Sequence, residues 1–375
     1  MHDSETTDTA AAALTIDLGA LVGNWKLLAD RVAPARCGAV VKADAYGLGA
    51  GPVVLSLLEA GCREFFVALV DEGIRLRGAL GEQWPVDARL HVLHGPMPGA
   101  EADCLAHDLV PVLNGLDQVE RWAALARRTG RRLPAALQGD TGMARLGLSP
   151  RELARLDAEP GLLDGIDPTL VISHLVAAES PDEPINAVQL KRYRLLRRRW
   201  PSAAGCLANS SGIFLGPDYH FDLVRPGAAL YGVAPQDGRP NPMQPVVRLQ
   251  GRLIQWREVE AGQGVGYNHT WHAPGPGPSR VATVSVGYAD GYLRSLSNRA
   301  TVRFGGASLP LVGRVSMDTI IVDVTAVDPE ALAPGAAFSL IDEVHDINAV
   351  AAQAGTNAYE ILTSLGPRYR RHYIR

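Results

Sequence analysis

The chain has 375 residues, a formal net charge of -4 and a mean hydropathy of +0.01. This length exceeds the usual size of one domain, so we expect two domains, each large enough to bury its own core. Acidic and basic residues are mixed along the chain, which argues against the strongly basic surface that nucleic acid or an anionic membrane would select. We expect neither partner.

The N-terminal 13 residues carry three acids and neither Lys nor Arg, unlike a secretory signal. No apolar run is long enough to span a bilayer. The cysteines lack CxxC spacing, which argues against a zinc site or a disulfide framework. We therefore expect a cytoplasmic protein without a bound metal, in which four scattered thiols stay reduced: Cys37, Cys62, Cys104 and Cys206.

After an N-terminal tail (1–12), short apolar runs alternate with amphipathic stretches as far as residue 233. This alternation is typical of parallel strands joined by crossover helices. The number of candidate strands predicts an α/β fold with an N-terminal (β/α)8 barrel of the TIM type over 13–240. Two of the expected helices cover 116–129 and 185–200, and the expected strands lie at 37–43, 64–70, 89–95, 109–114, 133–139, 168–175, 205–211 and 222–227.

Residues 234–245 are dense in Pro, Gly and Asn, as expected of a linker. Beyond them, apolar and polar residues alternate between turn signals, which is typical of half-exposed strands. We therefore expect a mainly β C-terminal domain over 241–375, with strands at 246–259, 280–288, 300–306 and 319–327.

Lysine is scarce, since the chain contains only Lys26, Lys42 and Lys191. Lys42 follows the apolar run Ala39–Val41 and precedes a Gly-rich turn, which places it at the C-terminal end of a barrel strand, where catalytic groups sit. A lysine there is costly to desolvate unless it is paired or covalently engaged, so we expect a functional role. The other two lysines lie in amphipathic stretches, and we expect them on the surface.

The segment AVVKADAYGLGA (39–50) resembles the cofactor-attachment segment of alanine racemases. The likeness continues in order through most of the chain. The further matching segments are GDTGMARLG (139–147), ISHL (172–175), ANSSG (208–212), VRPGAALYG (224–232), VGYNHTW (265–271), VGYADGY (286–292), GRVSMD (313–318) and AYEILTSLGPRYRRHY (358–373).

The resemblance implies a pyridoxal 5'-phosphate (PLP) enzyme, an isomerase that interconverts L-alanine and D-alanine by a two-base mechanism. Lys42 would bind PLP covalently as an aldimine and serve as the base on one face of the α-carbon. Tyr267 would serve the opposite face and reach the site of the partner subunit, so the resemblance implies a homodimer with shared active sites. His174 and Arg225 would support the tyrosine, and Arg225 would also face the pyridine nitrogen.

The remaining site residues follow from the same resemblance. Arg145 and the backbone of Met317 would bind the substrate, and three residues would line the corridor by which substrate reaches the site: Tyr288, Arg294 and Arg314. The cofactor, and its phosphate in particular, would be held by Tyr46, Asn209, Ser210, Gly227, Ala228 and Tyr359.

One position departs from the family pattern. Many alanine racemases have a carbamylated lysine seven residues before the arginine that corresponds to Arg145, and this chain has Gln138 there. An amide cannot form a carbamate. Arg145 would instead be held by the Gln138 carbonyl oxygen or by a bound anion such as chloride, and this leaves substrate breadth open.

Three alternatives stay open from the sequence. A serine or broad-specificity racemase shares the fold, since a pocket discriminates poorly against an added hydroxyl. A decarboxylase of similar architecture needs a cysteine from the C-terminal domain, whereas the four cysteines lie in the barrel half. A non-catalytic PLP-binding protein resembles the barrel alone. The sequence also leaves open whether the enzyme serves D-alanine biosynthesis or alanine breakdown.

Overall fold

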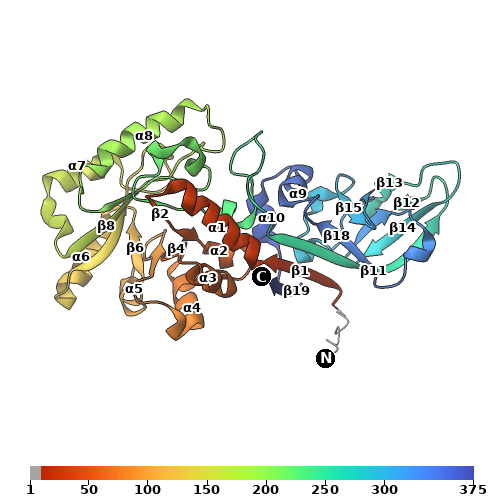
Figure 1. The fold of residues 1–375 in the computed structure, drawn as a ribbon, viewed down its shortest axis with the longest axis horizontal. Coiled ribbons are helices and arrows are strands. Elements are labelled where there is room, and N and C mark those ends of the chain that lie inside the picture. Colours follow the sequence, from red (N-terminus) through yellow and green to blue (C-terminus); the bar gives the residue numbers. More distant parts are fainter. Residues whose placement is uncertain (1–9) are drawn as a thin grey trace. The chain divides into compact units, whose positions relative to one another are not determined.

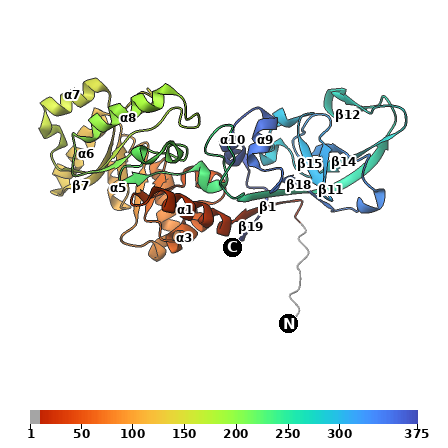
Figure 2. The same cartoon turned by 45° about the horizontal axis from the view of Figure 1, so that its top comes forward.

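The computed structural model describes residues 10–375 and divides into two compact units. The barrel unit is Leu21–Gln244. The β unit contains the described residues up to Ala20 together with Pro245–Arg375. Figures 1 and 2 show the elements of each unit along the chain.

Parallel strands form the interior of the barrel unit. A seven-stranded sheet has the sequential order β3 to β9, in which every neighbouring pair is parallel. The side chains of Phe65, Phe66, Leu137 and Ile172 are at most 1% exposed, as expected for strands covered on both faces. The seven strands are Ala39–Val40 (β3), Glu64–Val67 (β4), Arg89–Val92 (β5), Val110–Leu113 (β6), Leu133–Gln138 (β7), Ile166–Ile172 (β8) and Ala204–Cys206 (β9).

An eighth strand, β10 (Leu223–Val224), closes the ring. It pairs in parallel with β2 (Arg36–Cys37), which directly precedes β3. On its other side the chain bonds to the segment that carries β9, through Asp222 N–H to Gly205 O and an isolated parallel bridge between Asn209 and Arg225. The predicted (β/α)8 barrel is therefore confirmed, with a strand inside or overlapping each expected segment.

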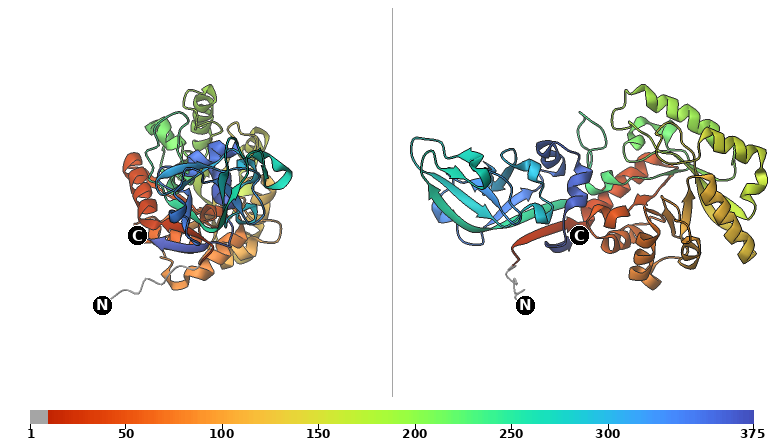
Figure 3. Two further views of the ribbon diagram at one scale, coloured as in Figure 1. Left: turned by 90° about the vertical axis from the view of Figure 1, so that its right-hand side faces the viewer. Right: turned by 180° about the vertical axis from the view of Figure 1, so that it is seen from behind.

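Helices surround these strands (Figures 1 and 3). In α6 (Leu116–Thr129) the buried residues Val119, Trp122 and Ala126 recur at helical spacing. The helix ends at Gly130, which has a φ of 62°, a conformation that residues with a side chain rarely adopt. The other barrel helices are Leu18–Val32 (α1), Ala50–Glu59 (α3), Val70–Leu80 (α4), Glu101–Ala106 (α5), Pro150–Ala158 (α7) and Pro184–Arg197 (α8).

The β unit is built on the long strand β11 (Val247–Val259), which pairs with three other strands and changes register near Leu253. Strand order along the main path is β16-β15-β18-β11-β1-β19; β14 branches from β11 and pairs in turn with β17. The expected mainly β fold is confirmed. Its remaining elements are Ala12–Asp17 (β1), Gly264–Val265 (β12), Trp271–His272 (β13), Ser279–Val284 (β14), Thr301–Phe304 (β15), Ala307–Pro310 (β16), Ile320–Asp323 (β17), Ala337–Ile341 (β18), Ile347–Ala354 (α9), Ala358–Ser364 (α10) and Arg370–Ile374 (β19).

The division into units differs from the expected boundaries in one respect. The barrel domain was expected to begin at residue 13, but Ala12–Asp17 form β1, which pairs antiparallel with β11 and parallel with β19. Its apolar pattern fits either sheet, so the sequence does not distinguish them. The second boundary falls after Gln244, inside the expected linker, and residues 1–9 of the expected tail lie outside the described residues.

Within residues 10–375, no helix combines the length and apolar character that a membrane crossing requires. The same residues contain no group of three or more His, Cys, Asp or Glu side chains arranged to hold a metal ion.

Candidate active site

Lys42 stands where the sequence places it, two residues beyond the end of β3. The next four residues, Ala43–Tyr46, all have φ between 52° and 55°, which makes a turn of left-handed helix from side-chain-bearing residues. Each such residue costs roughly 1–2 kcal/mol of backbone strain. The turn therefore persists only because the surrounding contacts hold it, and strain of this kind clusters at functional sites.

Positive charge gathers around the Lys42 amine. Burial lowers the pKa of Lys42, and the guanidinium groups of Arg145 and Arg225 lower it further, against the opposing carboxylate of Glu72. Burial, with the charges of Arg225, Arg145 and Lys42, lowers the pKa of His174 to about 3. His174 is therefore neutral at pH 7. Four residues from separate barrel segments thus share one electrostatic environment, which suits an anionic ligand.

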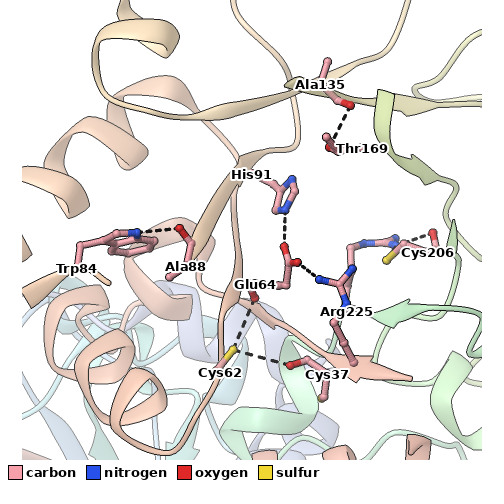
Figure 4. A network of polar contacts seen from close by, with 11 residues as sticks. Cys37, Cys62, Glu64, Trp84, Ala88, His91, Ala135, Thr169, Cys206 and Arg225 are labelled. Atoms are coloured by element: carbon pink, nitrogen blue, oxygen red, sulfur yellow. Dashed lines mark hydrogen bonds and ion pairs between the residues drawn. The ribbon is translucent and has the colours of Figure 1, made fainter. Parts of the chain in front are cut away.

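Arg225 is 4% exposed, and its guanidinium contacts neutral acceptors (Figure 4). Nη2 donates to Ser173 O at 2.8 Å, and Nη1 donates to Cys206 O at 2.9 Å and lies 2.9 Å from Cys206 Sγ. Among the described residues no carboxylate pairs with it. A buried cation without a counter-ion is costly, so this arrangement favours a negatively charged or electron-rich partner.

A second set of predicted residues meets at the end of β10. The N–H groups of Gly227 and Ala229 donate to Ser210 Oγ at 2.9 and 3.2 Å. A Cβ atom on Gly227 would lie 2.4 Å from Tyr46 Oη, so only glycine leaves this space open. The N–H of Ala228 has no acceptor among the described residues. This group of hydroxyl and N–H donors matches the chemistry of a phosphate site.

The neighbourhood of Gln138 differs from the first of the two arrangements expected. Gln138 is 8% exposed at the end of β7, and its backbone carbonyl accepts from Leu148 N–H at 2.7 Å. Within the described part of the chain, Arg145 makes no hydrogen bond to the Gln138 amide and no ion pair. Arg145 instead lies exposed on a loop that Asp140 Oδ1 fixes by accepting the N–H groups of Gly142 and Met143.

Tyr267 lies in the β unit, in the turn that joins β12 to β13. Gly266 at φ 71° and Asn268 at φ 61° bend the chain here into a short 3-10 turn. The Tyr267 side chain is 66% exposed. Tyr267, Tyr288 and Arg294 together line a cavity of about 510 Å³ with Val315, so the structure brings three predicted residues together here.

The other predicted residues of the β unit lie close to this cavity or on α10. Met317 O accepts from Ala289 N–H at 2.9 Å, next to Tyr288, and the Met317 side chain is 54% exposed. Arg314 is half-buried one residue before Val315. Tyr359 is half-buried on α10, a helix capped by Asn357 Oδ1. The barrel residue Asn209, by contrast, caps its own loop by accepting Gly212 N–H at 2.8 Å.

Several polar residues of the barrel interior were not anticipated. Cys206 was expected to be an unremarkable reduced thiol, yet it contacts Arg225. Glu64 is 5% exposed and pairs with Arg36 and with His91 Nε2 at 2.8 Å (Figure 4). The ionisable residues within the short strand segments EFFV and RLHV were the available signal, because a charged residue on a buried barrel strand needs a partner.

Fold and site together define a (β/α)8 barrel enzyme in which cationic groups gather around a buried lysine, with an additional β unit. Comparison with known proteins identifies the family. The family model for the alanine racemase N-terminal domain matches residues 16–235, and the model for the alanine racemase C-terminal domain matches residues 246–373.

Individual relatives agree. Alanine racemase from Rhodospirillum rubrum is 50% identical over 367 residues, covering 98% of this chain and 96% of that protein. The catabolic alanine racemase of Agrobacterium fabrum is 51% identical over 365 residues, covering 97% and 92%. The crystal structure of alanine racemase from Bartonella henselae, with covalently bound pyridoxal phosphate, superposes with a TM-score of 0.92 at 41% identity, covering 97% of this chain and all of that one.

The chain belongs to the alanine racemase family. It is an isomerase, and the resemblance found in the sequence is confirmed over nearly the whole chain.

Proposed function

We propose that the chain is a pyridoxal-phosphate-dependent enzyme that racemises alanine with two bases, Lys42 on one face of the α-carbon and Tyr267 of the partner subunit on the other. The observation that carries this proposal is the Lys42 amine itself. It has a lowered pKa, no ion pair among the described residues, and a place beside the unpaired guanidinium of Arg225. PLP, when bound, supplies the electron sink that stabilises negative charge at the α-carbon.

The barrel residues fit PLP by their chemistry. Lys42 Nζ would provide the amine for the covalent link, and burial together with the nearby arginines lowers its pKa, which favours the neutral, proton-accepting form. Arg225 would face the pyridine nitrogen. Because a guanidinium does not release its proton, Arg225 would leave that nitrogen unprotonated, which would favour reprotonation of the α-carbon over transamination.

The phosphate and the substrate would be held by separate groups. Tyr46, Ser210 and the Ala228 N–H would bind the phosphate, and Gly227 keeps the space open. Tyr359 from the β unit would add a hydroxyl. Arg145 and the backbone of Met317 from the partner subunit would bind the alanine carboxylate, since a guanidinium matches a carboxylate in shape and charge.

A second base must act from the face opposite Lys42, because one amine does not readily serve both sides of the α-carbon. Tyr267 is proposed for this role. Its exposure in the single chain fits a group that completes the site of another subunit, and a closed two-fold homodimer would then hold two shared sites. His174 is neutral and can accept a hydrogen bond while Arg225 supplies the positive charge near the phenol.

The first test is incubation of the purified protein with L-alanine in deuterated water. Formation of D-alanine that carries deuterium at the α-carbon supports the proposal. L-serine run in parallel separates an alanine racemase from a broad-specificity racemase, since equal rates on both substrates would favour the latter. Absence of exchange despite bound PLP would instead indicate a non-catalytic PLP-binding protein.

The second test concerns the shared site. Lys42→Ala and Tyr267→Phe subunits, each inactive alone, are mixed and allowed to exchange. If the two residues act across the dimer, each hybrid contains one site with both native residues, and activity returns. If both residues act within one subunit, the mixture stays as inactive as its components. Sedimentation of the wild type as a monomer would contradict the shared site independently.

A further inference from the structure

Glu72, at the start of α4, has more backbone partners than a helix cap requires. Its Oε2 accepts the N–H groups of Ala68 and Leu69 at 2.7 and 3.1 Å, which is the ordinary capping arrangement for the first turn of its own helix. Its Oε1 accepts the N–H of Ala43 at 2.7 Å. Ala43 lies 29 positions away in sequence and is the residue that follows Lys42.

Glu72 contacts the first residue of the left-handed turn, Ala43. Ala43 has φ 52° and ψ 47°, values that favour glycine over a residue with a side chain. The second residue of the turn, Asp44, accepts Ala50 N–H at the start of α3 through its Oδ1 at 2.7 Å. A hydrogen bond to a carboxylate is about twice as strong as one between neutral groups, so Glu72 is well suited to hold the first strained residue.

Glu72 also stands in the electrostatic environment of Lys42. The charged groups that act on the Lys42 amine are Arg145 and Arg225, which disfavour its protonated form, and Glu72, which favours it. Glu72, Asp44 and Arg75 line a small cavity of about 190 Å³ beside the turn, with Val41 at its edge. The carboxylate is therefore half-buried against the segment that carries the lysine. Loss of this carboxylate would affect Lys42 through the single hydrogen bond to the next residue, Ala43.

We infer that Glu72 is a positioning residue for Lys42, because its carboxylate fixes the left-handed turn through Ala43 N–H and so sets the direction in which the lysine leaves the barrel strand. This inference rests on the proposed function of Lys42 as the residue that binds PLP. Glu72 itself touches neither cofactor nor substrate in this assignment. Its loss acts through the backbone.

The chain contains a matched control in Glu152. Its carboxylate forms the same capping box at the start of α7, with Ser149 N–H and Oγ–H donating at 2.8 and 2.7 Å. It too reaches a distant backbone group, Leu116 N–H at 3.1 Å. Glu152 does not act on Lys42 electrostatically. Glu152→Gln therefore reproduces the loss of a capping carboxylate without disturbing the lysine turn.

The experiment compares the holoenzymes of the wild type, Glu72→Gln, Glu152→Gln and the double variant Glu72→Gln/Ala43→Gly. The readouts are the affinity for pyridoxal phosphate, the pH dependence of the absorbance of the bound cofactor, and the thermal midpoint. We expect Glu72→Gln to weaken cofactor affinity at least about tenfold, which corresponds to one charge-assisted hydrogen bond. Without the carboxylate, the pH midpoint of the absorbance change should fall.

Rescue distinguishes positioning from simple capping. Glycine adopts the left-handed conformation without strain, so Ala43→Gly should restore most of the cofactor affinity lost in Glu72→Gln. If Glu72 only caps α4, both Gln variants lower the thermal midpoint alike, cofactor affinity stays unchanged and Ala43→Gly rescues nothing, which overturns the inference. If Glu72→Gln does not fold, Glu72→Asp, whose shorter side chain cannot span both contacts, gives the same comparison with and without Ala43→Gly.

The result also separates this inference from the proposed function. A wild-type protein that does not bind pyridoxal phosphate through Lys42, seen as no modified Lys42 peptide after borohydride reduction, refutes both. A wild type with modified Lys42, together with unaltered Glu72→Gln, refutes the inference alone.

Discussion

The two units hold the residues proposed for the site in opposite ways. In the barrel unit, Arg225 is 4% exposed, and His174 and Lys42 have pKa values displaced by burial and by neighbouring cations. In the β unit, Tyr267 is 66% exposed and Met317 is 54% exposed. The barrel therefore builds its pocket by its own packing, whereas the β unit presents groups that no part of its own sheet covers. We therefore expect substitutions in the barrel unit to change mainly the affinity for the cofactor, and substitutions in the β unit to change mainly the rate of turnover.

The largest effect should come from Lys42→Ala. Removal of the amine eliminates both the covalent attachment of PLP and one base, so we expect D-alanine formation to fall by at least about a thousandfold. The measurement is deuterium incorporation from deuterated water, with bound cofactor monitored by absorbance. Lys191→Ala, at an exposed position on α8, is the control and should keep full activity. Activity retained in Lys42→Ala would contradict the central role of the barrel pocket.

Tyr267→Phe should separate the two units most sharply. It removes a proton-transfer group, worth about 10²–10⁴ in rate, and leaves the barrel pocket intact. We expect racemisation to be lost while cofactor affinity and absorbance stay at wild-type values. Tyr292→Phe is a matched control, because the buried Tyr292 hydroxyl has no hydrogen-bond partner among the described residues. A loss of cofactor in Tyr267→Phe would show that the two units do not divide the work in this way.

Gly227→Ala should have a smaller effect, and it should lower the affinity for the cofactor while leaving turnover intact. The added Cβ would lie 2.4 Å from Tyr46 Oη, and overpacking of this type costs about 1–3 kcal/mol. We therefore expect cofactor affinity to fall by about tenfold or more, measured by titration with pyridoxal phosphate, while saturating cofactor restores turnover. Gly78→Ala in α4, where a Cβ meets nothing within 4 Å, should leave affinity unchanged. Equal affinity in both variants would mean that the Gly227 site does not hold the phosphate.

The smallest effect concerns pH. His174 has a pKa of about 3 in the folded protein, below its ordinary value of 6.5, so the unfolded chain binds the proton first as pH falls. The folded cofactor-free protein should lose stability below about pH 6.5, by up to about 1 kcal/mol per pH unit. His174→Asn should flatten this dependence in urea melts between pH 6.5 and 5. An unchanged slope would show that His174 does not sit among the cations of the barrel.

Much of the barrel could be predicted from the sequence, because buried parallel strands are continuous apolar runs that recur between amphipathic helices. Lys42 stood out for the same reason, since it interrupts such a run, whereas the other site residues of the barrel came from the family resemblance. The left-handed turn after Lys42 could not be predicted, because Ala43–Tyr46 contains no glycine to signal positive φ. Nor could the contact between Cys206 and Arg225, which depends on the register between the neighbouring segments that carry β9 and β10.

The first strand of the described chain, β1, belongs to the β unit although the whole barrel sequence separates it from the other strands of that unit. Leu14 in β1 pairs with Leu249 in β11 and with Arg371 in β19, so the β unit is assembled from both sides of the barrel sequence. The barrel is in effect an insertion within the sheet of the other unit. During synthesis, β1 emerges long before its partners and stays unpaired until they follow. Deletion of β1 should therefore damage the sheet made from the C-terminal residues, while the barrel that follows it directly in sequence keeps all its strands.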